Sequence, residues 1–142
     1  MPMASNQRVA AMLHETAGSH MATLLEPLAP AAADQQSVVK VVSSEAGRAL
    51  YFSRSAIPFH REGGVPAPLF RHIGLYAYRA RFLKIFVRWP PAVAEQSESL
   101  EQLRALAHDA HIQVELAPET VPAGIDTESD LDAVRAALGA EQ

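Results

Sequence analysis

The sequence contains no cysteine. This absence excludes disulfide bonds, thiolate metal sites and a cysteine nucleophile, and it fits a cytoplasmic protein. Aromatic residues are also few, at 6% of the chain. No apolar run approaches the ~20 residues that a membrane-spanning helix needs. Residues 1–18 lack the continuous apolar stretch of a signal peptide. We therefore expect no membrane partner.

The residues that are present are those of a globular chain. Hydrophobic residues make up 49% of the 142 residues and charged residues 20%, a balance typical of folded proteins. A chain of this length suits one domain. It buries roughly two thirds of the surface that its unfolded form exposes. We predict a single domain over residues 1–142.

The net charge of −4 is unevenly distributed along the chain. Residues 48–88 carry eight basic groups and one acidic group, net +7, whereas residues 95–142 carry two basic and eleven acidic groups, net −9. The two blocks either pair with each other and with solvent, or serve an anionic ligand and a cation respectively. The basic residues alternate with apolar ones instead of forming a stripe, so nucleic acid is not an expected partner.

Hydrophobic periodicity and turn residues predict a series of strands and helices. We expect Ser5 to cap the first helix, with Val9, Met12 and Leu13 on its buried face, and Thr127 to cap the last, with Asp130 completing a capping box. The predicted strands are residues 21–26, 37–42, 48–53, 72–78 and 112–116, and the predicted helices are residues 5–15, 79–89, 99–108 and those from 127 onward.

This order of elements indicates the fold class. Strands and helices alternate, with one hairpin inserted, which favours an α/β sheet that is largely parallel and covered by helices. The apolar stripes predict that the two last helices bury Leu100, Leu103, Leu106 and Ala107, and Leu131, Val134 and Leu138, respectively. The sequence has no Gly-rich phosphate loop, HExxH or GxSxG motif. The residues alone therefore indicate an α/β domain without indicating its chemistry.

Four stretches, in order, resemble one enzyme family. They are VKVVSSEAGRALYFSRSAIP around Lys40 to Ile57, RHIGLYAYR from Arg71, ESLEQLR from Glu98 and GIDTESDLDAV from Gly124. Together with MATLLEPL at Met21, they resemble the CMP-Kdo synthetases, sugar-activating cytidylyltransferases, over about residues 5–138. The resemblance implies part of a nucleotidyltransferase-like mixed sheet with helices on both faces and an inserted hairpin.

The chain departs from the family pattern at several points. Gln35, Gln36 and Ser37 stand where the family usually has Asn-Pro-Asn, Phe59 stands where it usually has tryptophan, and the loop at 60–68 is shorter. The family's N-terminal half, which carries the CTP-binding loop and an aspartate that binds magnesium, has no counterpart. We therefore expect the C-terminal portion of such an enzyme.

The resemblance also implies site residues. Asp126 matches a catalytic residue that binds Mg²⁺, the family's cofactor, although an acidic residue at a helix N-terminus is also common for the dipole alone. Further matches imply contacts to the sugar acid Kdo. His72 and Tyr76 share a strand face, and their alternative role is core packing. Arg54 suits a carboxylate or is a surface arginine, and the pair Glu101 and Gln102 contacts the sugar or lies on a solvated helix face.

By resemblance, the intact enzyme transfers CMP from CTP to Kdo, giving CMP-Kdo and pyrophosphate for lipopolysaccharide biosynthesis. We expect this chain alone to be inactive, because the nucleotide-holding loop has no counterpart. We expect a homodimer, since residues 82–89 are rich in large apolar side chains and the family is dimeric. The alternatives are a non-catalytic remnant that dimerises or binds an acidic sugar, and a truncated version of an ordinary enzyme.

Overall fold

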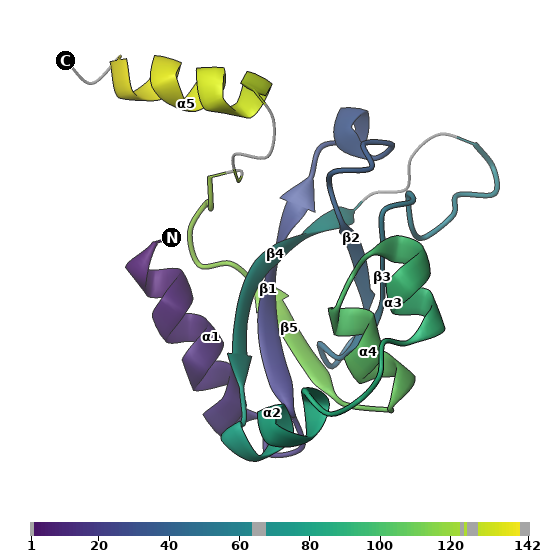
Figure 1. Cartoon of the computed structure of the whole chain (residues 1–142). Helices are drawn as coiled ribbons and strands as arrows, with labels where there is room; N and C mark the ends of the chain where they lie inside the picture. The colour runs from purple at the N-terminus through teal and green to yellow at the C-terminus, as the bar shows by residue number, and fades with distance from the viewer. Residues whose placement is uncertain (1, 64–67, 123, 125–127, 140–142) are drawn as a thin grey trace.

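The computed structural model describes residues 2–63, 68–122, 124 and 128–139. A five-stranded sheet with strand order β3-β2-β4-β1-β5 forms the centre of the molecule (Figure 1). The strands are β1 (Met21–Leu28), β2 (Lys40–Ser43), β3 (Ala49–Ser53), β4 (Leu69–Tyr78) and β5 (Ile112–Leu116). All five predicted strands are therefore present, with ends that differ by a few residues.

The directions of the strands make the sheet mixed. β1 pairs parallel with β5, with Met21 opposite Ile112, and antiparallel with β4. β2 pairs antiparallel with both β3 and β4. The prediction of a largely parallel sheet was wrong, since β1–β5 is the single parallel pair among the described strands. The β2–β3 hairpin reverses the chain between β1 and β4, and alternation of elements does not specify that reversal.

Helices cover both faces of this sheet, as the resemblance implied. α1 packs against β1 and β4 on one face, and α2 and α4 contribute to the buried cluster on the other. None of the described helices has the length and apolar character needed to cross a membrane. The helices are α1 (Met3–Glu15), the 3-10 turn η1 (Pro30–Ala32), α2 (Ala80–Phe86), α3 (Val93–Glu98), α4 (Gln102–Ala107) and α5 (Glu128–Gly139).

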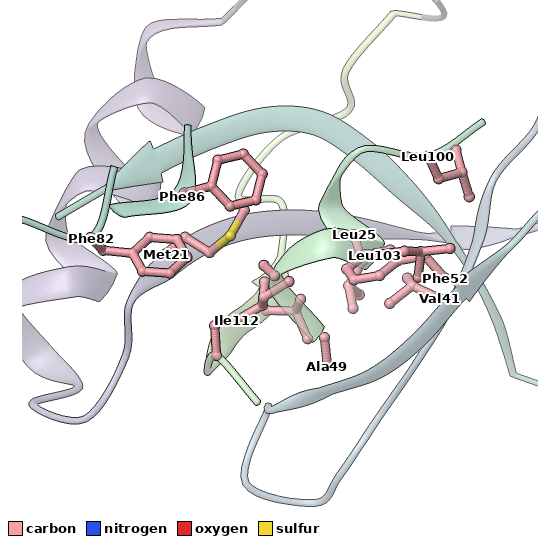
Figure 2. Close-up of a cluster of buried hydrophobic side chains, with 13 residues drawn as sticks. Met21, Leu25, Val41, Ala49, Phe52, Phe82, Phe86, Leu100, Leu103 and Ile112 are labelled. Carbon is pink, nitrogen blue, oxygen red and sulfur yellow. The ribbon is translucent and has the colours of Figure 1, made fainter. Parts of the chain in front are cut away.

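β1 separates two hydrophobic clusters because its side chains alternate between the faces. Met21 and Leu25 belong to the cluster under α2 and α4, whereas Ala22 and Leu24 face α1. Figure 2 shows the first cluster, in which side chains of the hairpin, β1, β5 and the helices converge. Its labelled members are Met21, Leu25, Val41, Ala49, Phe52, Phe82, Phe86, Leu100, Leu103 and Ile112.

The turn of the β2–β3 hairpin folds back onto β5. The carbonyl oxygen of Gly47 accepts a hydrogen bond from the Val114 amide at 2.7 Å. Gly47 has φ +79°, and a Cβ there would lie 2.7 Å from the Gln113 side chain and 2.9 Å from the Val114 carbonyl oxygen. Only glycine fits this conformation and this contact. This contact holds the hairpin against β5, where its side chains pack in the cluster under α2 and α4.

Several local predictions for the helices were wrong. Ser5 lies buried inside α1 and does not cap it; Pro2 holds the N-cap position. The helix predicted over residues 99–108 begins later, at Gln102. Residues 93–98 form a separate helix, α3, that was not predicted, and Ser99 ends it with a left-handed conformation (φ 53°). Ala107, predicted to be buried, is exposed. The buried face of α1, with Val9, Met12 and Leu13, is as predicted.

The last helix lies away from the sheet. In Figure 1, α5 stands beyond the end of the strands, apart from the other helices. Leu138 is 63% exposed, and Leu131 and Val134 are only half-buried, so the predicted buried face is wrong at Leu138. Thr127, the predicted cap, lies outside the described residues. An apolar stripe indicates that a helix can pack, but the partner must come from the tertiary structure.

Candidate functional site

An irregularity in β4 brings two of the predicted site residues together. In a regular strand, residues four apart are separated by about 13 Å. Here the register shifts, so that His72 lies opposite Leu25 while Tyr76 lies opposite Thr23, only two residues away on β1. The ring centroids of His72 and Tyr76 are consequently 5.2 Å apart. The bulge converts two residues on one strand face into a contacting pair.

His72 is half-buried, and its ring is closely surrounded. Its Nε2 lies 3.0 Å from the Thr23 hydroxyl oxygen, and the ring of Phe52 meets it edge-on with centroids 5.0 Å apart. Burial lowers the pKa of His72 to about 4, because the low-dielectric surroundings disfavour the charged form. The imidazole is therefore neutral at physiological pH.

Tyr76 is held in its protonated form by the same environment. Burial raises the pKa of Tyr76, and neighbouring Tyr78 and the charge of Glu101 raise it further. The Tyr76 and Tyr78 rings are 5.7 Å apart. A neutral imidazole and a neutral phenol side by side offer hydrogen-bond donors and acceptors without a net charge.

α4 carries the second predicted pair to the same face of the sheet. Glu101 is exposed at the start of the helix and Gln102 is buried, while Leu103 packs in the core cluster that Tyr76 also contacts. The negative charge of Glu101 contributes to the raised pKa of the Tyr76 phenol. That all four side chains line one cavity stays a prediction.

A cavity of about 490 Å³ opens beside His72. It lies where β4 meets the segment before β2 and the segment that leads into α5. Gly124 and Asp130, which line it, flank Asp126 in the sequence, and Asp126 itself lies outside the described residues. The other lining residues are Gln35, Ser37, Val38, Val39, Arg71, Ile73, Gly74, Val121 and Pro122.

Arg54 is engaged by backbone carbonyl groups. Its Nε donates to the Glu98 carbonyl oxygen at 2.7 Å, Nη1 to that of Gln36 at 3.0 Å and Nη2 to that of Ser99 at 3.3 Å. Three of the five guanidinium N–H donors are thus directed at the backbone. Its predicted role toward a carboxylate stays a prediction, and it would use the remaining donors.

Sequence reasoning overlooked Lys40. This lysine is fully buried and contacts the backbone of Arg54 and of the segment before β2. Its ammonium group donates to the carbonyl oxygens of Gln35 at 2.9 Å, Val38 at 2.7 Å and Arg54 at 2.5 Å. Burial lowers the pKa of Lys40. The three donors of the ammonium match three acceptors, so Lys40 ties the 35–38 segment to the end of β3. A lone lysine within a β-branched run was the signal that could have indicated this role.

Metal ligands do not gather in the part of the chain that the structure describes. No group of three or more histidine, aspartate or glutamate side chains there is placed to hold an ion. The described residues therefore supply no metal geometry, and the predicted ligand, Asp126, remains untested.

Comparison with known proteins identifies the class. A cytidylyltransferase family model matches residues 2–112, and the chain belongs to this family of nucleotidyltransferases. Among its relatives are the 3-deoxy-manno-octulosonate cytidylyltransferases of Alcanivorax borkumensis, 44% identical over 99% of this chain, and Pseudomonas fluorescens, 48% identical over 99%. The chain spans 59% of the length of each.

A solved structure shares the fold. It is that of CMP:2-keto-3-deoxy-manno-octonic acid synthetase complexed with CTP, which superposes with a TM-score of 0.84 at 35% identity. The match covers 96% of this chain and 56% of that one. The nucleotidyltransferase-like mixed sheet implied by the sequence resemblance is thereby confirmed.

Proposed function

We propose that this chain provides the Kdo-binding part of a CMP-Kdo synthetase. In the complete reaction the 2-hydroxyl oxygen of Kdo attacks the α-phosphorus of CTP, forming the sugar–phosphate bond. The bond from that phosphorus to the β-phosphate oxygen breaks and pyrophosphate leaves. The product serves lipopolysaccharide biosynthesis. The location that fits these substrates is the cytoplasm, where CTP is made.

The observation that carries this proposal is the pairing of His72 with Tyr76 across the bulge. Both groups are neutral, and both belong to the face under α4, which also carries Glu101 and Gln102. A site of neutral donors and acceptors suits a ligand with many hydroxyl groups, because each hydroxyl needs a hydrogen-bond partner when it leaves water. We assign Glu101, Gln102 and Arg54 to the same ligand, with Arg54 toward its carboxylate.

The direct test is titration of the chain with Kdo, followed by backbone amide shifts in NMR spectra. We expect shifts at His72, Tyr76 and the first turn of α4. Tyr76→Phe should weaken binding at least several-fold, because a ligand hydroxyl loses its partner. Tyr51→Phe is the matched control: Tyr51 is 37% exposed on β3, and its loss should not change binding. Equal weakening by both variants, or no shifts at these residues, contradicts the proposal.

We further propose that Asp126 contributes a Mg²⁺ ligand in the complete enzyme. Support comes from its neighbours Gly124 and Asp130, which line the cavity beside His72. A carboxylate together with phosphate oxygens is how Mg²⁺ is normally held. When bound, the ion would neutralise charge on the triphosphate. In a chain completed with the family's N-terminal half, Asp126→Asn should lower kcat by more than tenfold, and a change within about threefold contradicts the assignment.

We propose that the chain alone does not form CMP-Kdo. It spans 59% of the relatives named above, and its sequence contains no Gly-rich phosphate loop. Positioning of the triphosphate supplies most of the rate in such transfers. The purified chain with CTP, Kdo and Mg²⁺ should therefore release no pyrophosphate above background.

Adding the N-terminal half as a separate polypeptide distinguishes the remaining possibilities. Rescue of pyrophosphate release indicates an enzyme fragment. A folded complex that binds Kdo but stays silent favours the second candidate, a non-catalytic module that binds an acidic sugar. Turnover by the chain alone, above about 0.1 s⁻¹, contradicts the proposal that the nucleotide site is absent.

We also propose a homodimer that uses the outer side of α2. Phe82 and Phe86 on the inner side of this helix are buried, whereas Leu83, Ile85 and Val87 are 40%, 47% and 64% exposed. Several exposed large apolar side chains on and beside one short helix favour an association surface there. Light scattering should show a dimer for the parent and a monomer for Ile85→Lys. Val93→Lys, a change at a position 82% exposed on α3, should remain dimeric.

A further inference from the structure

Thr23 is a fully buried hydroxyl residue at the centre of β1. Its Oγ1 lies 2.7 Å from the Leu75 carbonyl oxygen, 2.9 Å from the Ile73 carbonyl oxygen and 3.0 Å from His72 Nε2. Ile73 and Leu75 belong to the irregular part of β4, where the register shifts. One side chain therefore contacts both the bulge and the ring that the bulge brings toward Tyr76.

Counting protons decides which partner donates. A threonine hydroxyl has one proton, and the two carbonyl oxygens can only accept. If His72 Nε2 took the hydroxyl proton, two carbonyl oxygens would face the lone pairs of Oγ1 with no proton between them. The repulsion is relieved when Oγ1 shares its one proton between the two carbonyl oxygens and accepts from an Nε2–H. Because the ring is neutral, its other nitrogen, Nδ1, then carries a lone pair.

We infer that Thr23 is a positioning residue that pins the β4 bulge and holds His72 as the Nε2–H tautomer, leaving Nδ1 as the acceptor offered to a ligand. The second part of this inference rests on the proposed sugar-binding function. It specifies the chemistry at His72: a hydroxyl group of the ligand donates to the ring. A ligand that presents only an acceptor at this point is selected against, because an acceptor facing a lone pair is repelled.

The surroundings of the ring support a fixed orientation. Phe52 and Tyr76 contact the ring with centroids 5.0 and 5.2 Å away, and the backbone amide of His72 donates to the Val39 carbonyl oxygen at 2.8 Å. Burial keeps the pKa of His72 low, so protonation does not mask the choice of tautomer near neutral pH. Thr23 is the contact that distinguishes one ring nitrogen from the other.

The tautomer can be read without any ligand. Two-bond proton–nitrogen correlation spectra of the chain, labelled with ¹⁵N in its six histidines, distinguish the two neutral forms, and His72→Gln identifies the His72 signals. We expect an Nε2–H signal in the parent and in Thr23→Ser, which keeps the hydroxyl. Thr23→Val, which has the same shape without it, should lose this preference. Ser5→Ala, which removes another fully buried hydroxyl, should leave the tautomer unchanged.

Either of two results, in the parent or in Thr23→Val, overturns the inference. One is a parent protein in which His72 is protonated at Nδ1, and the other is a Thr23→Val variant that retains the parent tautomer. If Thr23→Val does not fold, the parent spectrum still decides. A Thr23→Ser variant with the parent's tautomer and amide shifts around the bulge supports the inference, and one that loses the Nε2–H signal while folded contradicts it.

Addition of Kdo separates this inference from the proposed function. We expect the Nδ1 signal of His72 to move in the parent and in Thr23→Ser. If the tautomer is as inferred but Kdo moves neither nitrogen, the sugar-binding function fails and the positioning by Thr23 stands. If Kdo shifts both nitrogens of a ring protonated at Nδ1, the function stands and the role of Thr23 is contradicted.

Discussion

The carboxylate of Glu26 and the guanidinium of Arg71 form an ion pair that holds both backbone polar groups of Val121, in the loop after β5. Arg71 donates to Glu26 Oε2 from Nε at 2.9 Å and from Nη2 at 2.5 Å. Glu26 Oε1 accepts from the Val121 amide at 2.6 Å, and Arg71 Nη2 donates to the Val121 carbonyl oxygen at 2.7 Å. The pair thus fixes the segment that leads to Gly124 and the cavity beside His72.

Loss of this ion pair should be costly. Glu26→Gln leaves the partly buried charge of Arg71 without its counter-ion, so we expect the free energy of unfolding to fall by about 3 kcal/mol. Urea unfolding followed by circular dichroism measures the change. Asp132→Asn, which breaks the exposed pair with Arg135, is the control and should change stability by less than about 1 kcal/mol. Similar losses for both variants would contradict the structural role.

Ser5 provides a prediction of opposite sign. Its hydroxyl is fully buried inside α1 and, within the described part of the chain, has no hydrogen-bond partner. Ser5→Ala removes an unsatisfied polar group and introduces the best helix former, so the protein should become more stable by about 1 kcal/mol. Ser97→Ala, at an exposed position of α3, should gain only a few tenths. A loss of stability in Ser5→Ala would show that the hydroxyl has a partner.

His72 makes stability depend on pH. Its pKa of about 4 in the folded state lies below the value near 6.5 in an unfolded chain. Between these values the unfolded state binds more protons, so stability is fully present above pH ~6.5 and is lost as the pH falls toward ~4. The expected loss is about 3 kcal/mol, from about 1.4 kcal/mol per pKa unit.

Comparison of a His72 variant with the parent separates the contribution of His72 to the pH dependence of stability from the contribution of the carboxylates. His72→Gln should lack the part of this loss, about 2 kcal/mol, that falls between pH 7 and pH 4.5 when urea unfolding is measured at these two pH values. His14→Gln, at an exposed position of α1, should keep the pH dependence of the parent. A His72→Gln variant with an unchanged pH dependence would show that the ring titrates normally.

Trp89 reports on the packing of α4. It is the only tryptophan, and its ring lies parallel to that of His108 with centroids 3.8 Å apart and an interplanar angle of 5°. His108→Ala uncovers one side of the indole, so its fluorescence maximum should shift to longer wavelength and stability should fall by about 1 kcal/mol. His60→Ala, in an exposed loop, should change neither. An unchanged spectrum in His108→Ala would mean that the stack does not persist in solution.

The chain itself determined the positions of all five strands and the buried face of α1. The alternation of apolar residues and the clusters of glycine and proline are local signals in the sequence. A strand needs an apolar face to pack on the core whatever its place in the sheet, so these signals do not depend on the tertiary arrangement. The motif RHIGLYAYR likewise placed His72 and Tyr76 on one strand face. The family followed from the order of four such motifs, each short enough to be read without a structure.

Only the tertiary structure decided how these parts meet. Strand direction depends on the reversal at the β2–β3 hairpin. The turn at Ser99 depends on how α3 and α4 dock. The periodicity of apolar residues therefore specifies neither feature. The contact between His72 and Tyr76 requires a bulge whose carbonyl groups are satisfied by Thr23, 50 residues distant from Ile73. Such an irregularity is stable only when a partner on another strand compensates for it, and a partner remote in sequence leaves no local pattern.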